Sequence, residues 1–295
     1  MKERKAAQPC VYKRVGDCNV KADVYLPEGS GPHPVVVWIH GGALIMGWRG
    51  DLLSWQRDRY LDAGCAVVAI DYRLAPETKL PGIIDDLQDA FRWVSESGPA
   101  SFGLDPQRIA AVGHSAGGYL TLMSGVCVSP RPKALVSFYG YGDIIGPWYT
   151  QPDPFYRRRP LVGEAEAWFA VGSREISEDA GCDRERFYLY CRQEGLWPLM
   201  VGGRNPADDE EFFRRYCPVR NVDGEYPPTL LLHGDQDTDV LHEQSVMMAE
   251  ALARAGVEHE LLTIPEGGHG FDAEGDEPAR EAMDHVLAFL RKALA

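Results

Sequence analysis

Short, uninterrupted runs of apolar residues recur along the chain and constrain its fold more than any other feature. The clearest is VVVWI at residues 35–39, directly after Pro34. A strand with one face in water alternates apolar and polar residues, whereas a continuous run indicates burial on both faces, as in a parallel sheet. Similar runs occupy residues 66–70, 109–112, 134–138 and 229–232, and a more mixed one occupies residues 260–264.

Between these runs, apolar residues recur with a helical period. Ile83, Ile84, Leu87, Phe91 and Val94 fall on one predicted helix face. A second helix is predicted to end at Gly256, and Val286, Leu287, Phe289 and Leu290 are predicted to lie in the last helix. The predicted buried face of the second helix comprises Val246, Met247, Ala249, Ala251 and Leu252. Strands that alternate with helices predict an α/β protein, with a mostly parallel central sheet and helices on both faces.

The amino-terminal segments 10–15 and 20–26 alternate instead, which predicts two antiparallel strands joined by a turn at Gly16-Asp17. Cys10 and Cys18 would lie in this hairpin, so a disulfide between them stays open. The seven cysteines are scattered, without a CxxC pair, and we expect reduced thiols in a cytoplasmic protein. They are Cys10, Cys18, Cys65, Cys127, Cys182, Cys191 and Cys217.

The regular alternation stops between about residues 143 and 226. This stretch holds fourteen of the 30 aromatic residues, and a plain connection between two strands needs far fewer residues. We therefore expect a single domain over residues 1–295, with a cap-like helical insertion at 143–226. The aromatic residues are predicted to form a small core of the insertion's own rather than a ligand wall.

The acidic composition narrows the range of partners. The formal net charge is −14, which disfavours binding to a phosphate backbone or an anionic lipid surface. No stretch approaches the roughly 18 apolar residues of a membrane span, and the histidines lack metal-ligand spacing. We expect a small-molecule substrate, no nucleic acid or membrane partner, and no metal or cofactor. The oligomeric state stays open, with a homodimer among the options.

Residues 113–118, GHSAGG, lie between a predicted buried strand and a predicted helix. In this strand-turn-helix context, G-x-S-x-G marks a sharp turn that exposes a nucleophilic serine. Residues beside the serine must be very small for the turn to close. We predict Ser115 as the nucleophile, at the carboxyl edge of the sheet and at the positive end of a helix.

A second glycine motif, HGGA at residues 40–43, ends the predicted strand at 35–39. Acyl transfer passes through a tetrahedral intermediate whose oxyanion needs preorganised hydrogen-bond donors, and glycines let backbone N–H groups approach it. We predict the N–H groups of Gly41, Gly42 and Ala116 as these donors.

A serine hydroxyl needs a base, and the base needs a carboxylate that fixes its tautomer. His269 lies between glycines in GGHGF, after the last predicted strand, and is the predicted base. Asp237 is the predicted carboxylate, with Asp235 and Asp239 as alternatives in the same loop. The chain order serine, aspartate, histidine is the order typical of α/β-hydrolases.

These motifs together resemble the α/β-hydrolases related to hormone-sensitive lipase. That family's carboxylesterases carry an HGGG-type motif, Y-R-L-A-P-E, GDSAGG and HGxxDxxV. Here the corresponding segments are HGGA (40–43), YRLAPE (72–77), GHSAGG (113–118) and HGDQDTDV (233–240). The resemblance spans about residues 35–271; it implies an α/β-hydrolase fold with esterase activity and maps the family's aspartate onto Asp237.

Two residues depart from that pattern: Ala43 replaces the last glycine and His114 replaces an acidic residue. Both are similar to features of short carbohydrate-ester and feruloyl-type esterases. Few residues precede the first strand, so we expect any amino-terminal cap to be small. The YRLAPE segment is expected to pack beneath the oxyanion loop.

The sequence therefore predicts a serine carboxylesterase that hydrolyses small esters with short or medium acyl, aryl or sugar groups. Trp48, Trp55 and His114 are the residues predicted to line its substrate site. An aryl formamidase or a peptidase could use the same triad, and an acyl transferase would pass the acyl group to an acceptor other than water. A small-molecule receptor without turnover is the remaining alternative.

Overall fold

A computed structural model describes residues 7–179 and 183–295, and its centre is an eight-stranded sheet. The strand order is β1-β2-β4-β3-β5-β6-β7-β8. The pairings β1–β2 and β2–β4 are antiparallel and the others are parallel, which confirms the predicted sheet. The strands are β1 (Gln8–Val15), β2 (Cys18–Tyr25), β3 (His33–Ile39), β4 (Ala66–Ile70), β5 (Leu104–His114), β6 (Ala134–Phe138), β7 (Thr229–Gly234) and β8 (His259–Ile264).

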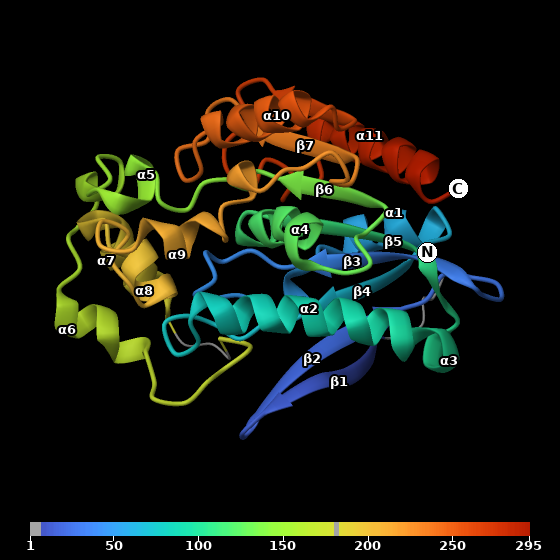
Figure 1. Ribbon diagram of the computed structural model, residues 1–295, viewed down its shortest axis with the longest axis horizontal. Helices are drawn as coiled ribbons and strands as arrows, with labels where there is room; N and C mark the ends of the chain where they lie inside the picture. Colours follow the sequence, from blue (N-terminus) through green and yellow to red (C-terminus); the bar gives the residue numbers. More distant parts are fainter. Residues whose placement is uncertain (1–6, 180–182) are drawn as a thin grey trace.

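Helices cover both faces of this sheet (Figure 1). Those outside the 143–226 stretch are α1 (Ser54–Asp62), α2 (Leu80–Glu96), α3 (Gly98–Phe102), α4 (Ala116–Cys127), α10 (Glu243–Ala255) and α11 (Glu277–Ala293). Between β6 and β7 the chain forms shorter helices, namely α5 (Pro147–Thr150), α6 (Glu164–Ala167), α7 (Glu185–Glu194), α8 (Trp197–Gly202) and α9 (Glu210–Arg214). These lie together beyond one end of the sheet in Figure 1.

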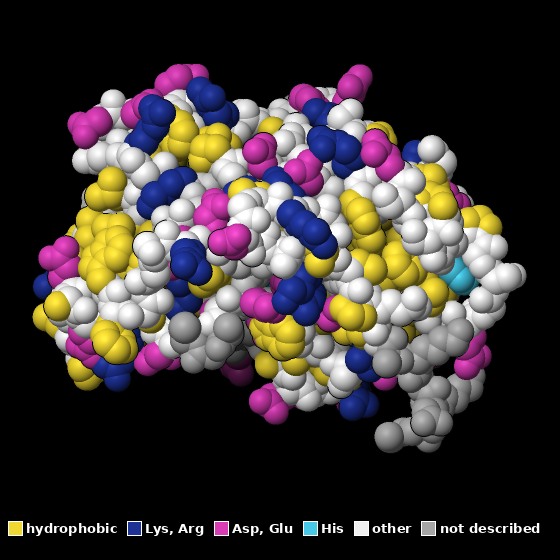
Figure 2. All heavy atoms as spheres, turned by 90° about the horizontal axis from the view of Figure 1, so that it is seen from below, with side chains coloured by type: hydrophobic (Ala, Val, Ile, Leu, Met, Phe, Trp, Pro, Cys, Tyr) yellow, Lys and Arg dark blue, Asp and Glu magenta, His cyan; other side chains and the backbone are white. Residues whose placement is uncertain are grey.

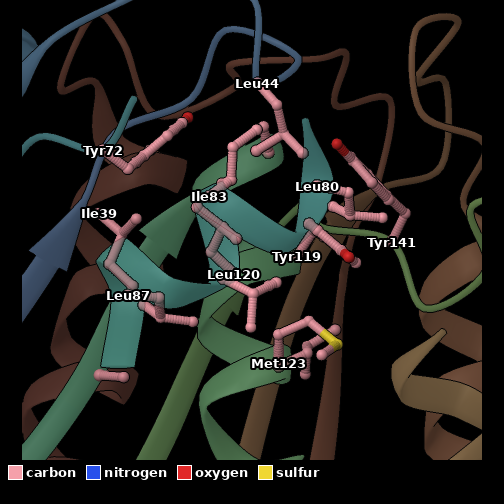
Figure 3. Close-up of a cluster of buried hydrophobic side chains, with 14 of the residues drawn as sticks. Ile39, Leu44, Tyr72, Leu80, Ile83, Leu87, Tyr119, Leu120, Met123 and Tyr141 are labelled. Atoms are coloured by element: carbon pink, nitrogen blue, oxygen red, sulfur yellow. The ribbon is translucent and has the colours of Figure 1, made fainter. Parts of the chain in front are cut away.

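The buried strands supply two hydrophobic cores, one on each face. In β3, Val37 and Ile39 join the cluster that contains α2 and α4, whereas Val36 joins the cluster that contains α1 and α11. Figure 3 shows part of the first cluster, where Ile83 of α2 and Leu120 of α4 gather near Ile39. Because successive strand residues point to opposite faces, burial of both faces explains why these strands lack polar residues.

The helix α10 departs from its predicted face. Met247 is exposed and Met248 is fully buried, so the predicted inclusion of Met247 in the buried face is wrong. Two polar residues set the rotation of the helix. The side-chain oxygen of Gln244 accepts the N–H of Asp143 at 3.1 Å, and the Ser245 hydroxyl lies 2.7 Å from Nδ1 of His233.

The aromatic residues of the 143–226 stretch pack into the main core. Tyr149 and Trp197 stack with ring centroids 4.2 Å apart, and both belong to the cluster that contains α2 and α4. The prediction of a separate core is therefore wrong. In the amino-terminal hairpin, Cys10 and Cys18 are free thiols, and Cys182 lies outside the described residues.

Charged side chains of both signs are interspersed on the face shown in Figure 2. Across residues 7–179 and 183–295, no helix is long and apolar enough to cross a membrane. The same residues contain no group of three or more His, Cys, Asp or Glu side chains arranged to hold a metal ion.

Candidate active site

Ser115 occupies a strained turn between β5 and α4. Its backbone angles are φ 55° and ψ −117°, a region that residues with a Cβ rarely adopt. The turn is held by a hydrogen bond from the Ser115 N–H to the Phe138 carbonyl (2.9 Å) and one from Tyr119 to the Ser115 carbonyl (3.0 Å). A Cβ at Gly117 would lie 2.0 Å from the Ile39 carbonyl oxygen, so glycine is required there.

The loop that follows β3, residues 40–46, lies beside this turn. A Cβ built on Gly41 would lie 3.4 Å from Cβ of Ser115. The Gly42 carbonyl accepts the N–H groups of Ile45 and Met46, both at 2.9 Å, which closes a tight turn. Among the described residues, the N–H groups of Gly41, Gly42 and Ala116 do not appear as donors in backbone bonds outside helices and strands. Their role as donors to an oxyanion stays a prediction.

Residues 72–77 support the 40–46 loop from the sheet side. The Tyr72 hydroxyl donates to the carbonyls of His40 and Gly41, each at 3.1 Å. The Ala75 N–H donates to the Leu44 carbonyl at 2.8 Å. These contacts agree with the predicted packing role of this segment.

The 143–226 stretch supports the same loop from the other side. Nε1 of Trp197 donates to the Ala43 carbonyl at 2.9 Å, and Nε of Arg184 donates to the Ile45 carbonyl at 2.6 Å. Arg184 is 1% exposed and also forms an ion pair of 2.7 Å with Glu77. Ala43 has φ 55°, a left-handed conformation that favours glycine. The bond from Trp197 therefore holds the loop at one of its two non-glycine residues with positive φ, the other being Leu44 (φ 62°).

The predicted base and carboxylate lie in contact. Nδ1 of His269 is 2.8 Å from Oδ2 of Asp237, and the other oxygen of this carboxylate accepts the N–H groups of Asp239 (2.9 Å) and Val240 (3.0 Å). Nε2 of His233, which is fully buried, also lies 3.2 Å from Oδ2. His233 is not among the site residues predicted from the sequence, although it lies four residues before Asp237.

The two alternative carboxylates have different places. Asp235 is exposed, and its side chain accepts the N–H of Glu266 at 2.8 Å. Asp239 lies on the far side of the histidine ring, with Oδ2 3.4 Å from Nε2 of His269. Asp237 is the candidate located at Nδ1, the nitrogen that an orienting carboxylate contacts.

Electrostatics favour an ion pair between Asp237 and His269. Burial raises the pKa of Asp237, but hydrogen bonds with His233 and His269 outweigh burial and hold this pKa well below its usual range. Burial lowers the pKa of His269, whereas its bond to Asp237 and the charge of Asp239 raise this pKa above its ordinary value. The histidine is therefore a stronger base than a free imidazole.

Ser115 and His269 each contact a residue at the end of β6. The ring of Tyr139 lies edge-on to the His269 ring, with centroids 4.6 Å apart, and Tyr139 follows Phe138, whose carbonyl holds the Ser115 N–H. Within the described residues, the Ser115 hydroxyl forms no hydrogen bond with His269. Such bonds are often long in unliganded enzymes and tighten when substrate binds.

The three residues predicted to line a substrate site differ in exposure. His114 is buried, with its ring stacked on Phe138 (centroids 4.4 Å apart). Trp48 is 40% exposed and packs against Arg49, while Trp55 is partly buried. Contact of these three residues with substrate stays a prediction.

Asp272, which is not among the site residues predicted from the sequence, joins His114 to the loop that carries His269. Nε2 of His114 lies 3.1 Å from Oδ2 of Asp272, which also accepts a 2.5 Å bond from Gln56, while Oδ1 accepts the Tyr139 hydroxyl at 2.8 Å. Burial raises the pKa of Asp272, but the His114 ring and these hydrogen bonds lower it to about 2. This charged hub holds Tyr139 against His269.

A family model described as the alpha/beta hydrolase fold matches residues 36–273, and the chain belongs to this family. Among curated relatives, a non-reducing polyketide synthase of Aspergillus calidoustus is 29% identical over 96% of this chain. Methylphloroacetophenone synthase of Cladonia uncialis is 27% identical over 89% of the chain. The chain spans only 14% and 12% of the lengths of these two relatives.

Solved structures share the fold over nearly the whole chain. The thermophilic carboxylesterase EstE1, from a metagenomic library, has a TM-score of 0.72 at 23% identity, covering 100% of this chain and 92% of its own. A propionate-bound esterase of Thermogutta terrifontis has a TM-score of 0.69 at 22% identity, covering 97% and 94%. A Staphylococcus aureus protein of unknown function has a TM-score of 0.78 at 22% identity, covering 94% and 96%. The predicted α/β-hydrolase fold is confirmed, and family and fold together support a hydrolase.

Proposed function

We propose that this chain is a serine carboxylesterase in which Ser115 is the nucleophile, His269 the base and Asp237 the orienting carboxylate. The observation that carries the proposal is the 2.8 Å contact between Asp237 and His269 at the sheet edge that also holds the strained Ser115 turn. A strained serine, a histidine base and an orienting carboxylate are the parts that acyl transfer requires.

In the proposed reaction, the Ser115 hydroxyl attacks the ester carbonyl and His269 accepts its proton. The N–H groups of Gly41, Gly42 and Ala116 stabilise the oxyanion; losing one such donor typically costs about 2.7–4 kcal/mol. His269 then protonates the leaving alcohol. Water attacks the acyl-enzyme with His269 again as base, which releases the acid and restores Ser115.

We propose small esters with a short or medium acyl, aryl or sugar group as the substrate class. Aryl formamides and peptides are alternatives on the same triad, and a panel of the three compound classes separates them. A receptor without turnover is the alternative if none is cleaved. Product analysis distinguishes hydrolysis from transfer to another acceptor.

A thioester is a second candidate substrate, because curated relatives that match most of the chain are named as polyketide synthases. Thioester cleavage would use the same nucleophile and base. Parallel assays with an acyl thioester and the oxygen ester of the same acyl group compare the two candidates. A kcat/KM that is at least tenfold higher for the thioester would favour this second candidate.

The deciding experiment measures hydrolysis of p-nitrophenyl acetate, butyrate, octanoate and palmitate by the wild type and by Ser115→Ala. Loss of the nucleophile should lower kcat by several orders of magnitude, and a serine protease loses about 10⁶-fold. Equal rates from the two folded proteins would refute the proposal. If only the wild type is active, its preference among the four acyl-chain lengths would indicate the size of the acyl site.

A further inference from the structure

The candidate base lies between two carboxylates rather than beside one. Oδ2 of Asp237 is 2.8 Å from Nδ1 of His269, and Oδ2 of Asp239 is 3.4 Å from Nε2. In the proposed mechanism, Nε2 is the nitrogen that takes the proton from Ser115. The second carboxylate therefore faces the reacting nitrogen, a place that the orienting role of Asp237 does not explain.

The 143–226 stretch fixes the position of Asp239. Oδ1 of Asp239 accepts hydrogen bonds from the hydroxyls of Tyr156 (2.6 Å) and Tyr188 and from Nη1 of Arg192 (2.8 Å). Nη1 of Arg192 also donates to the Asp239 carbonyl at 2.9 Å. With Oδ1 saturated by three donors, Oδ2 is the oxygen left to face the histidine.

Arg192 is an unusual donor because its side chain is only 1% exposed. It also pairs with Asp153 at 2.5 Å, and its guanidinium lies 4.6 Å from the centre of the Tyr156 ring and 5.0 Å from that of Tyr149. A buried charge in such surroundings is costly unless its partners are fixed. Arg192 therefore joins α7 to the loop after β7 through its ion pair with Asp239, and it also pairs with Asp153.

The charged groups that face His269 are Asp237 and Asp239 from the loop after β7 and Arg192 from α7. Among the described residues, the Tyr139 ring, after β6, also contacts His269. Two negative charges against one positive charge favour a protonated ring. The charge of Arg192 lowers the pKa of His269 and so opposes the effect of Asp239. The 143–226 stretch, which contains Arg192, therefore affects the electrostatic potential at His269.

We infer that Asp239 is a positioning residue for His269, through which the 143–226 stretch adjusts the basicity of the reacting nitrogen. The inference rests on the proposed function. When the Ser115 proton moves to Nε2, the Asp239 carboxylate stabilises the new positive charge and does not take the proton. The proton then goes to the leaving oxygen, as in the two-step reaction.

The test compares Asp239→Asn with the wild type and with Glu266→Gln, which removes one exposed charge three residues from His269. The activity needs a neutral His269, so kcat/KM rises with pH through the pKa of this histidine. Asp239→Asn should move the midpoint of this rise to lower pH by about 1 unit. Glu266→Gln should leave the midpoint within about 0.2 units of the wild type. An unchanged midpoint in folded Asp239→Asn would overturn the inference.

A second measurement does not depend on turnover. The histidine Cε1 resonances are titrated by NMR in Ser115→Ala, with and without Asp239→Asn, and His269→Gln assigns the signal. The inference expects the pKa of His269 to fall in the double variant. If the wild type lacks esterase activity but this pKa shifts, the proposed function fails and the coupling between Asp239 and His269 stands. If Asp239→Asn does not fold, Tyr188→Phe is tested in its place. This variant removes a hydrogen-bond donor to Oδ1 of Asp239 and should raise the midpoint of the pH profile. An unchanged midpoint would overturn the inference.

Discussion

The sheet edge and the 143–226 stretch reach the candidate site by different physical means. The sheet edge places Ser115, Asp237 and His269 in short loops after β5, β7 and β8, and the backbone bonds to the Asp237 carboxylate are local in sequence. The 143–226 stretch contributes through two buried arginines, Arg184 and Arg192, whose partners lie far away along the chain. The sheet edge therefore carries the candidate reacting groups, and the other region holds neighbouring loops through contacts that are distant in sequence.

The largest expected effect is at the sheet edge. Asp237→Asn should lower kcat for p-nitrophenyl acetate by about 10⁴-fold, because the histidine loses its orienting charge. Asp235→Asn, in the same loop but exposed, should keep at least half of the activity. If the two variants lost activity equally, the assignment of the carboxylate to Asp237 would be wrong.

Arg184→Met should give the largest loss of stability in the 143–226 stretch. Breaking a buried ion pair leaves Glu77 unpaired, which costs about 3–5 kcal/mol in the free energy of unfolding. Chemical denaturation measures this loss. Arg186→Met, at an exposed site of the neighbouring helix turn, is the matched control and should cost less than about 1 kcal/mol. Similar losses for the two arginines would contradict a buried structural role for Arg184.

Tyr72→Phe and Trp197→Phe compare the two supports of the 40–46 loop directly. Each removes a donor to a loop carbonyl, worth about 1 kcal/mol per hydrogen bond. We expect kcat to fall by about fivefold in each variant, with KM changed by less than twofold, because the oxyanion donors lose their preorganisation. Trp168→Phe, at a partly exposed tryptophan, controls for the loss of ring size in Trp197→Phe and should retain wild-type kcat. An effect confined to Tyr72→Phe would mean that the sheet side alone positions the loop.

The smallest effect is expected at an exposed ion pair between the 143–226 stretch and the loop before β6. Arg131, after α4, pairs with Asp223 through two bonds of 2.7 Å at the surface. Arg131→Met should lower the free energy of unfolding by about 0.2–1 kcal/mol, and added salt should reduce the difference from the wild type. A loss above about 2 kcal/mol would show that exposed and buried links between the regions contribute alike.

Features carried by local sequence were predictable. The apolar runs at 66–70 and 134–138 coincide with β4 and β6. Strands that are buried on both faces consist mainly of apolar residues, so such runs predict them well. The motif around Ser115 was equally clear, because a turn this sharp requires glycines next to the serine. The buried face of α10 was not predictable from the sequence. Residues 246–249 are all apolar, and the rotation of the helix about its axis depends on hydrogen bonds made by Gln244 and Ser245.

The ionic contacts near the site were hidden for a different reason. A charged residue in a sequence usually indicates a solvated surface, yet Arg184 and Arg192 are each 1% exposed. Their partners, such as Glu77 and Asp239, are separated from them by 107 and 47 residues. No local spacing connects residues so far apart, so only the folded chain shows that they meet.

The supports of the 40–46 loop also bear on the order of folding events. Arg184 and Ile45 are 139 residues apart, and Trp197 and Ala43 are 154 residues apart. Contacts of such sequence separation form only after the entropy of ordering the intervening chain has been overcome. During refolding, strand pairs that are close in sequence, such as β1 and β2, should therefore form before this loop reaches its final shape.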